Sequence, residues 1–149
     1  ESGGYDPGML EWGGENLEQS FRVWQCGGEI VVERRAVIGH IFYRPLPPNK
    51  VSPNQVQKNQ ARAAIVWLDA YYSNFLAAVP VVWSLDLGDG LGTQLALRTA
   101  LQCQSFEWFV DRFRSVFEFQ GLLVHEMHNL RHVGSSWCLE AVIAADGST

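Results

Sequence analysis

The segment Trp12-Gly13-Gly14-Glu15-Asn16 combines side chains that could bind a sugar. Two glycines let a backbone approach a ligand because no Cβ intervenes. The Glu15 carboxylate and the Asn16 amide can hydrogen-bond to sugar hydroxyls, and Trp12 offers an apolar wall for a sugar face. A helix is expected to begin here, so backbone N–H groups point outward at the same place. On residue types alone, a glycine turn followed by an acidic first helical turn is the simpler interpretation.

His40 is a candidate metal ligand. A neutral imidazole at a strand end can hold a divalent cation, although a histidine between glycine and Ile-Phe is more often a core residue bonded to backbone. One histidine does not make a metal site. A second candidate group consists of His125, Glu126, His128 and His132. Their spacing could place three histidines on one helical face, as in a zinc site, but the segment is typical of a linker.

Composition restricts the class of protein. The 149 residues are 47% apolar and 18% charged, which fits one folded domain or slightly more. The net charge of -5 and the lack of a basic stripe argue against nucleic-acid binding. No apolar run approaches the roughly 20 residues of a membrane span. Because the chain begins with Glu1 rather than Met, we expect its natural N-terminus and targeting signal to lie upstream.

Periodicity predicts an N-terminal half of mixed structure. We expect an irregular glycine-rich loop, a helix, two short strands, a proline-rich loop and a long helix closed by Pro80. Their ranges are 1–14, Glu15 to Gln25, Glu29 to Glu33, Ala36 to Phe42, 45–54 and Lys58 to Leu76. A loop over Leu85–Thr93 and two short helices, Gln94 to Leu101 and Ser105 to Phe113, follow. After about Val116 the pattern favours the short strands of a new unit around 122–124, 137–140 and 142–143.

Several segments match one protein family in order and spacing. They are Tyr5 to Met9, Trp12 to Glu18, Ser20 to Gly28 and Gly39 to Phe42, with weaker matches at Arg62 to Tyr72 and Leu101 to Phe109. The chain resembles the polypeptide N-acetylgalactosaminyltransferases, glycosyltransferase family 27, which move N-acetylgalactosamine (GalNAc) from UDP to Ser or Thr of a protein. The resemblance is almost continuous from Gly4 to His40. A long ordered match of this kind is specific.

The resemblance implies an α/β fold and an incomplete enzyme. Residues 1–115 would be the C-terminal part of a GT-A nucleotide-sugar domain. Residues 116–149 would be a linker and the truncated start of a ricin-like β-trefoil lectin domain. The implied location is the lumenal side of the Golgi membrane, with a single-pass type II anchor in the part of the protein upstream of this chain. The implied partners are UDP-GalNAc and a polypeptide acceptor with Ser or Thr.

The resemblance also implies roles for individual residues. Trp12, Glu15 and Asn16 match positions around the donor sugar and diphosphate, and His40 matches a histidine ligand of Mn²⁺. Arg44 could match an arginine on the loop that closes over UDP. The family's other metal ligands, in an Asp-x-His motif, are absent from this chain. Transfer would retain the anomeric configuration, with the leaving phosphate accepting the proton, so no residue is assigned as catalytic.

The three cysteines, Cys26, Cys103 and Cys138, leave two interpretations open on the sequence alone. They are three buried reduced thiols, or one disulfide plus a cysteine paired outside the chain. The resemblance implies a Cys26–Cys103 bridge in an oxidising lumen and makes Cys138 the first lectin-domain cysteine. Arg35 replaces another family cysteine, so that bridge is lost here.

Departures from the family pattern keep an alternative function open. Besides Arg35, Tyr43 intervenes before Arg44, and Leu46 and Pro48 replace an expected histidine and tyrosine. The full protein could therefore be a diverged, non-catalytic member that binds glycopeptide or UDP. A third, weaker interpretation is a complete small sugar-binding module, against which the unfinished unit after Val116 argues.

Overall fold

The computed structural model describes residues 3–41, 51–119, 130–131 and 138–139, and the regular secondary structure among them is almost entirely helical. The α-helices are α1 (Glu15–Gln25), α2 (Pro53–Trp67), α3 (Tyr72–Ala78), α4 (Leu91–Ala100), α5 (Phe106–Arg112) and α6 (Arg114–Phe119). Two 3₁₀ turns, η1 (Asp69–Tyr71) and η2 (Pro80–Ser84), flank α3. The strands β1 (Leu130–Arg131) and β2 (Cys138–Leu139) form one short antiparallel pair.

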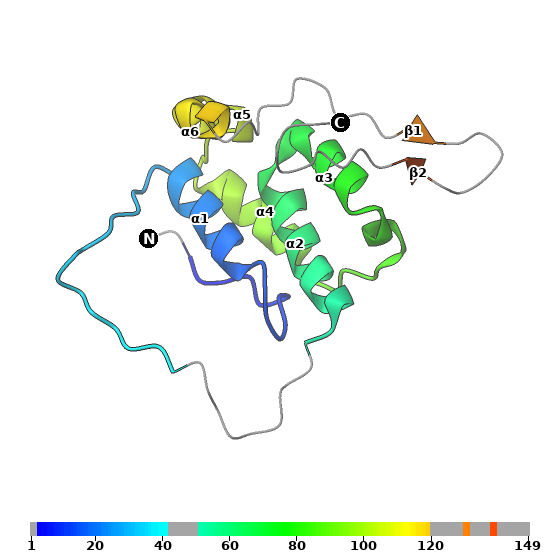
Figure 1. Cartoon of the computed structure of the whole chain (residues 1–149), viewed down its shortest axis with the longest axis horizontal. Coiled ribbons are helices and arrows are strands. Elements are labelled where there is room, and N and C mark those ends of the chain that lie inside the picture. The colour runs from blue at the N-terminus through cyan, green and yellow to red at the C-terminus, as the bar shows by residue number, and fades with distance from the viewer. Residues whose placement is uncertain (1–2, 42–50, 120–129, 132–137, 140–149) are drawn as a thin grey trace.

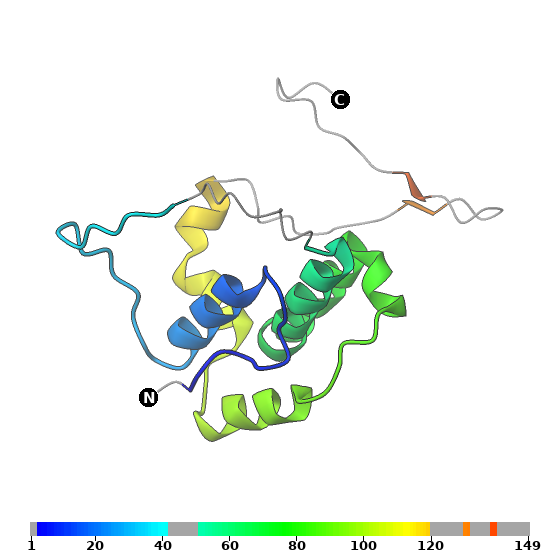
Figure 2. The ribbon, with the colours of Figure 1, turned by 90° about the horizontal axis from the view of Figure 1, so that it is seen from below.

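Helix α2 is the centre of the packing (Figure 1). It contacts α1, α3 and α4, and the view in Figure 2 shows α4 crossing beneath it. The fully buried apolar side chains lie mainly on α2: Ala61, Ala63, Ala64, Val66 and Trp67. Small alanine side chains let neighbouring backbones approach closely, so the N-terminal loop and the other helices can pack on one element.

Aromatic rings join α1 to α5. Phe21 on α1 makes edge-to-face contacts with Phe106 and Phe109, with ring centroids 5.4 and 5.3 Å apart. Trp24 packs in the same way on Phe113, at 5.0 Å. Edge-to-face geometry is favourable for such rings beyond the apolar area that they bury. This cluster holds the C-terminal helices against the first one.

The predicted helices are largely confirmed, with one correction. The prediction for Glu15 to Gln25 coincides with α1, and α4 and α5 lie close to the two predicted short helices. The predicted long helix from Lys58 to Leu76 is wrong in its bounds, because α2 begins at Pro53 and ends at Trp67. Proline suits the first helical position, where its missing N–H has no partner to lose. Asp69 has φ 48°, and this left-handed residue separates α2 from α3.

The two predicted strands at 29–33 and 36–42 are wrong within the described range. Residues 29–41 are irregular, and each of them is exposed. A strand needs hydrogen bonds from a neighbouring strand, and the described part of the chain provides none at this place. The expected α/β class is therefore not seen in the described residues, where helices dominate and β1–β2 is the one strand pair.

The expected domain boundary at 115/116 falls within α6. Of the strands predicted after Val116, residues 138–139 form β2, while 122–124, 137, 140 and 142–143 lie outside the described residues. The boundary stays a prediction. No helix in the described ranges has both the length and the apolar character needed to cross a membrane.

Candidate functional site

The segment from Trp12 to Asn16 forms a corner that leads from the N-terminal loop into α1. Trp12 is 63% exposed, Asn16 is exposed and Glu15 is partly exposed. Gly14 is the N-cap of α1, and no side chain caps this helix end. The first-turn N–H groups are therefore directed outward beside three side chains that can bind a ligand. The role of these three residues at a donor sugar stays a prediction.

The two glycines of the corner serve packing against α2, which differs from the expected role. Gly13 and Gly14 are buried, with φ 93° and 90°. A Cβ on Gly14 would lie 2.9 Å from the backbone carbon of Asn59, and one on Gly13 would lie 3.0 Å from Val56 Cγ1. The close approach that requires glycine is thus to α2 and not to a ligand.

Asn59 on α2 fixes the backbone before the corner. Its Nδ2 donates to the carbonyl oxygens of Leu10 at 2.8 Å and Trp12 at 3.2 Å, and its Oδ1 accepts from Leu10 N at 3.2 Å. Asn59 is 1% exposed. Because buried hydrogen bonds of this kind are costly to break, Trp12 is presented from a backbone with a defined position.

Arg62, one turn further along α2, holds the N-terminal loop with a buried ion pair. Its Nε and Nη2 donate to the two carboxylate oxygens of Asp6, each at 2.8 Å, in a bidentate arrangement. Its Nη1 donates to the carbonyl oxygens of Leu87 and Asp89, at 2.8 and 2.9 Å. A Cβ on Gly8 would lie 2.1 Å from the guanidinium, so this loop also needs a glycine. Bidentate pairing fixes orientation as well as distance.

A second buried ion pair supports α1 itself. Arg22 and Glu18 are 3% and 2% exposed, and Arg22 Nε lies 2.8 Å from Glu18 Oε1. Arg22 Nη1 also donates to the carbonyl oxygen of Gly3 at 2.9 Å. The start of the N-terminal loop is therefore tied to α1, while its middle is tied to α2. Trp12, Glu15 and Asn16 thus lie on a corner held from both sides.

His40 lies outside α1 and α2, the two helices that hold this corner. It is in the exposed irregular segment 29–41. The described residues contain no group of three or more His, Cys, Asp or Glu side chains that could hold a metal ion. The donor set within the described part of the chain therefore does not fit a divalent cation by itself. Arg44 and the predicted group at His125, Glu126, His128 and His132 lie outside the described residues.

The disulfide implied by the family resemblance is present. Cys26, directly after α1, is bonded to Cys103, between α4 and α5. Beside it, Gln104 N donates to the carbonyl oxygen of Gln25 at 2.7 Å. The bridge closes a loop with a sequence separation of 77.

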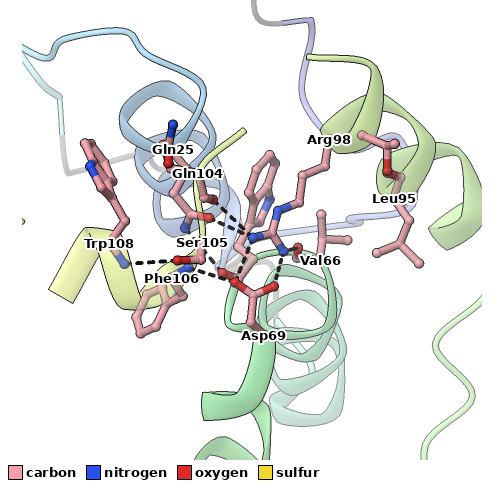
Figure 3. A network of polar contacts seen from close by, with 11 residues as sticks. Gln25, Val66, Asp69, Leu95, Arg98, Gln104, Ser105, Phe106 and Trp108 are labelled. Atoms are coloured by element: carbon pink, nitrogen blue, oxygen red, sulfur yellow. Dashed lines mark hydrogen bonds and ion pairs between the residues drawn. The ribbon is translucent and has the colours of Figure 1, made fainter. Parts of the chain in front are cut away.

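Arg98 on α4 joins four elements near the disulfide (Figure 3). Its guanidinium binds both carboxylate oxygens of Asp69, at 2.6 and 2.8 Å, and donates to the carbonyl oxygen of Val66 and to Gln25 Oε1. Phe106 N donates to Asp69 as well, at 2.7 Å. Burial acts to raise the pKa of Asp69, but the hydrogen bonds from Arg98 and Phe106 and the Arg98 charge together hold that pKa below its usual range.

Asp6, Asn59, Arg62 and Arg98 are the positioning residues that sequence reasoning missed. Asn59 and Arg62 lie three positions apart on the predicted helix. Two polar residues at this spacing share one helix face, and such a face usually points to solvent. The Arg-Asp pairing is between residues 56 apart, which no local pattern reveals. The available signal was that both partners lie in stretches that match the family, Tyr5 to Met9 and Arg62 to Tyr72.

Comparisons with known proteins show that the chain is similar in sequence to a group of transferases. It is 46% identical over 114 residues to polypeptide N-acetylgalactosaminyltransferase 4 of Caenorhabditis elegans, a match that covers 74% of this chain and 19% of the relative. It is 38% identical over 153 residues to N-acetylgalactosaminyltransferase 7 of Drosophila melanogaster, covering 95% of this chain and 26% of the relative. The chain belongs to the polypeptide N-acetylgalactosaminyltransferase family. A scan against protein-family models found no match.

A solved transferase of this family shares the fold. A crystal structure of GalNAc-T7 with UDP, GalNAc and Mn²⁺ matches with a TM-score of 0.67 and 35% identity, over 81% of this chain and 22% of that chain. This match assigns the helical framework to a GT-A transferase domain. The chain spans about a fifth to a quarter of the length of these relatives.

Proposed function

We propose that this chain is the part of a polypeptide N-acetylgalactosaminyltransferase that contributes one wall of the donor-sugar site. The whole protein would transfer GalNAc from UDP-GalNAc to Ser or Thr hydroxyls of proteins, with retention of configuration. The observation that carries the proposal is that the exposed Trp12 and Asn16 and the partly exposed Glu15 share a corner held by buried residues of two helices. Catalytic sites need such fixed support for the side chains that touch a substrate.

Each residue of the corner has a chemical role in this proposal. The Trp12 indole covers one face of the sugar, while the Glu15 carboxylate accepts and the Asn16 amide donates hydrogen bonds at its hydroxyls. The uncapped N–H groups at the start of α1 add positive electrostatic potential near a bound anion. These contacts orient the donor. No residue of the chain is assigned as nucleophile or base.

Mn²⁺ is the proposed metal of the whole protein, and His40 is its proposed ligand from this chain. An exposed imidazole is a suitable ligand, and the GalNAc-T7 structure was obtained with Mn²⁺. The described residues contain no group of three or more ligating side chains, so we propose that the rest of the whole protein completes the ligand set. When bound, the metal would neutralise charge on the leaving diphosphate. Arg44 is proposed to close over UDP from the segment that follows His40.

The lectin start and the cellular location are also proposals. The antiparallel pairing of Leu130 with Leu139 and of Arg131 with Cys138 is compatible with a β unit that begins after α6. The Cys26–Cys103 disulfide fits an oxidising lumen, as in the Golgi. The membrane anchor would belong to the upstream part of the whole protein.

A chimeric enzyme tests the proposed activity. In this chimera, residues 1–149 replace the matching segment of the Drosophila relative, and transfer from UDP-GalNAc to a Ser/Thr peptide is measured. We expect Mn²⁺-dependent transfer that falls at least about tenfold in the Trp12→Ala variant. A folded chimera that binds UDP yet transfers no sugar would favour the non-catalytic alternative. The isolated 149-residue chain is expected to bind Mn²⁺–UDP weakly, and micromolar binding by it would contradict its role as one part of the site.

A further inference from the structure

Glu11 has a left-handed backbone directly before Trp12. Its φ is 60°, and among the described residues the other non-glycine positions with positive φ are Asp69 and Gln102. Aspartate adopts this conformation more readily than glutamate, because its short side chain can bond to the local backbone. A glutamate keeps it only where surrounding contacts outweigh its cost. The contacts that hold Glu11 therefore set the direction in which the chain enters Trp12.

Asn59 holds the backbone on both sides of Glu11. Its side chain bonds to the N–H and the carbonyl oxygen of Leu10, and also to the carbonyl oxygen of Trp12. Its Oδ1 accepts a further hydrogen bond from Gln55 Nε2 at 2.8 Å. These contacts use both N–H donors and both acceptor positions of the buried amide. Asn59 therefore cannot follow a change in the backbone at Glu11 without losing one of its bonds.

The Glu11 side chain provides a separate anchor on α2. Its Oε2 accepts a hydrogen bond from Ser52 N at 3.1 Å, between residues 41 apart in sequence. Ser52 is the N-cap of α2, and in a capping box the third helical residue accepts from the N–H of the N-cap. Here that third residue, Gln55, donates its amide to Asn59, and Glu11 accepts from Ser52 N. The start of α2 and the residue before Trp12 are thus fixed to each other.

We propose that Glu11 is a positioning residue for the donor sugar, which it does not itself touch. Its bond to Ser52 N offsets the cost of the left-handed backbone and so fixes the orientation of Trp12. This inference rests on the proposed function of Trp12 at the donor sugar.

A positioning role has consequences that a direct contact with the sugar does not have. Alanine at position 11 keeps the cost of the left-handed backbone and loses the bond that offsets it, so Trp12 departs from its orientation. Glycine at position 11 has no such cost, so the bonds of Asn59 suffice to keep the backbone in place. If Glu11 touched the sugar, glycine would be no better than alanine.

The test measures donor binding in the chimeric transferase that carries residues 1–149. Glu11→Ala should raise the KM for UDP-GalNAc at least about fivefold, while the KM for the acceptor peptide changes less than about twofold. Glu11→Gln keeps an oxygen that can accept from Ser52 N, and Glu11→Gly removes the backbone cost. Both should return the KM for UDP-GalNAc to within about twofold of the unmodified chimera. A glutamine or glycine variant as impaired as Glu11→Ala would overturn the proposal.

A double-mutant cycle tests whether Glu11 acts through Trp12. In the Trp12→Ala background, Glu11→Ala should change the KM for UDP-GalNAc by less than about twofold, since no indole remains to be oriented. An equal rise in both backgrounds would overturn the proposal. If the inference alone fails, Trp12→Ala raises this KM and Glu11→Ala does not. If the proposed function fails, Trp12→Ala by itself leaves this KM unchanged.

Gln102 provides the matched control, because it is a non-glycine residue with a left-handed φ of 53°. It lies beside Cys103, whose partner Cys26 follows the end of α1 opposite to the corner. Gln102→Ala and Gln102→Gly should both leave the KM for UDP-GalNAc within about twofold of the unmodified chimera. A rise in Gln102→Ala equal to that in Glu11→Ala would show that the KM reports general loss of structure, and it would overturn the proposal.

Discussion

Asp6 and Arg62 form an ion pair that is removed from solvent, with side chains 1% and 0% exposed and 2.8 Å between Asp6 Oδ1 and Arg62 Nη2. The pair joins the N-terminal loop to α2 across 56 positions of sequence. The Nη1 group of Arg62 donates to the carbonyl oxygens of Leu87 and Asp89. One arginine therefore sets the position of two loops relative to the central helix.

Removal of the Asp6 charge should destabilise the chain strongly. The Asp6→Asn variant leaves Arg62 charged and buried without its partner, which costs about 3–5 kcal/mol. Urea unfolding of the disulfide-intact chain measures this loss. The control is Asp86→Asn, at an exposed position where the new side chain can still accept from Gly88 N. A loss under about 1 kcal/mol for Asp6→Asn would contradict the buried ion pair.

A comparison of two glycines with similar backbone angles distinguishes the cost of backbone strain from the cost of a steric clash. Gly14 and Gly27 have φ 90° and 86°, so alanine at either costs about 1–2 kcal/mol in backbone strain. A Cβ on Gly14 also meets the backbone of Asn59 at 2.9 Å, whereas nothing lies within 4 Å at Gly27. Gly14→Ala should therefore cost about 1–3 kcal/mol more than Gly27→Ala in denaturant unfolding. Equal losses of stability in the two variants would contradict the close packing of Gly14 against α2.

The disulfide should contribute about 4 kcal/mol to stability, because it closes a loop with a sequence separation of 77 and so restricts the unfolded chain. The Cys26→Ala, Cys103→Ala double variant is expected to lose this amount in chemical unfolding. A thiol count on the denatured, unreduced chain should find one free thiol, from Cys138. Three free thiols would refute the bridge.

Asp69 should make stability depend on acid pH. Its folded pKa lies below its unfolded value of about 3.9, so its contribution is fully present above that value and is lost as pH falls through the folded pKa. Asp69→Asn should reduce stability at pH 7 by about 1 kcal/mol or less, since the side chain is 37% exposed. It should also flatten the loss of stability below about pH 4. Glu29→Gln, on the exposed segment, is the charge-matched control. If it changed the pH dependence of stability as much as Asp69→Asn, the acid-dependent loss of stability could not be assigned to Asp69.

Trp12 should matter for binding and not for folding. Its side chain is 63% exposed, so Trp12→Ala is expected to change the unfolding free energy by about 0.5 kcal/mol or less. In the chimeric transferase the same variant should raise the KM for UDP-GalNAc. Trp83→Ala, at another exposed tryptophan, provides the matched control. A large loss of stability in Trp12→Ala would assign the indole to structure.

The bounds of a helix could be predicted where the spacing of apolar residues and a glycine stop mark them within the segment itself. The helix from Glu15 to Gln25 follows from the spacing of Leu17, Phe21 and Trp24 and from the Gly27-Gly28 stop, and α1 has these bounds. The strands expected around Ile30 and Ile38 did not form within the described residues. Apolar runs give a propensity for strand, but a strand exists only when another one provides its hydrogen bonds.

The sequence by itself determined the family and the first helix, and it singled out Trp12, Glu15 and Asn16 as candidates, because motifs and helical periods are properties of neighbouring residues. Only the tertiary structure decided what supports that group. It assigned Gly13 and Gly14 to packing on α2 and Arg62 to Asp6, and it left His40 on an exposed segment. These assignments depend on which distant segments meet, and burial strengthens a polar contact only after they do.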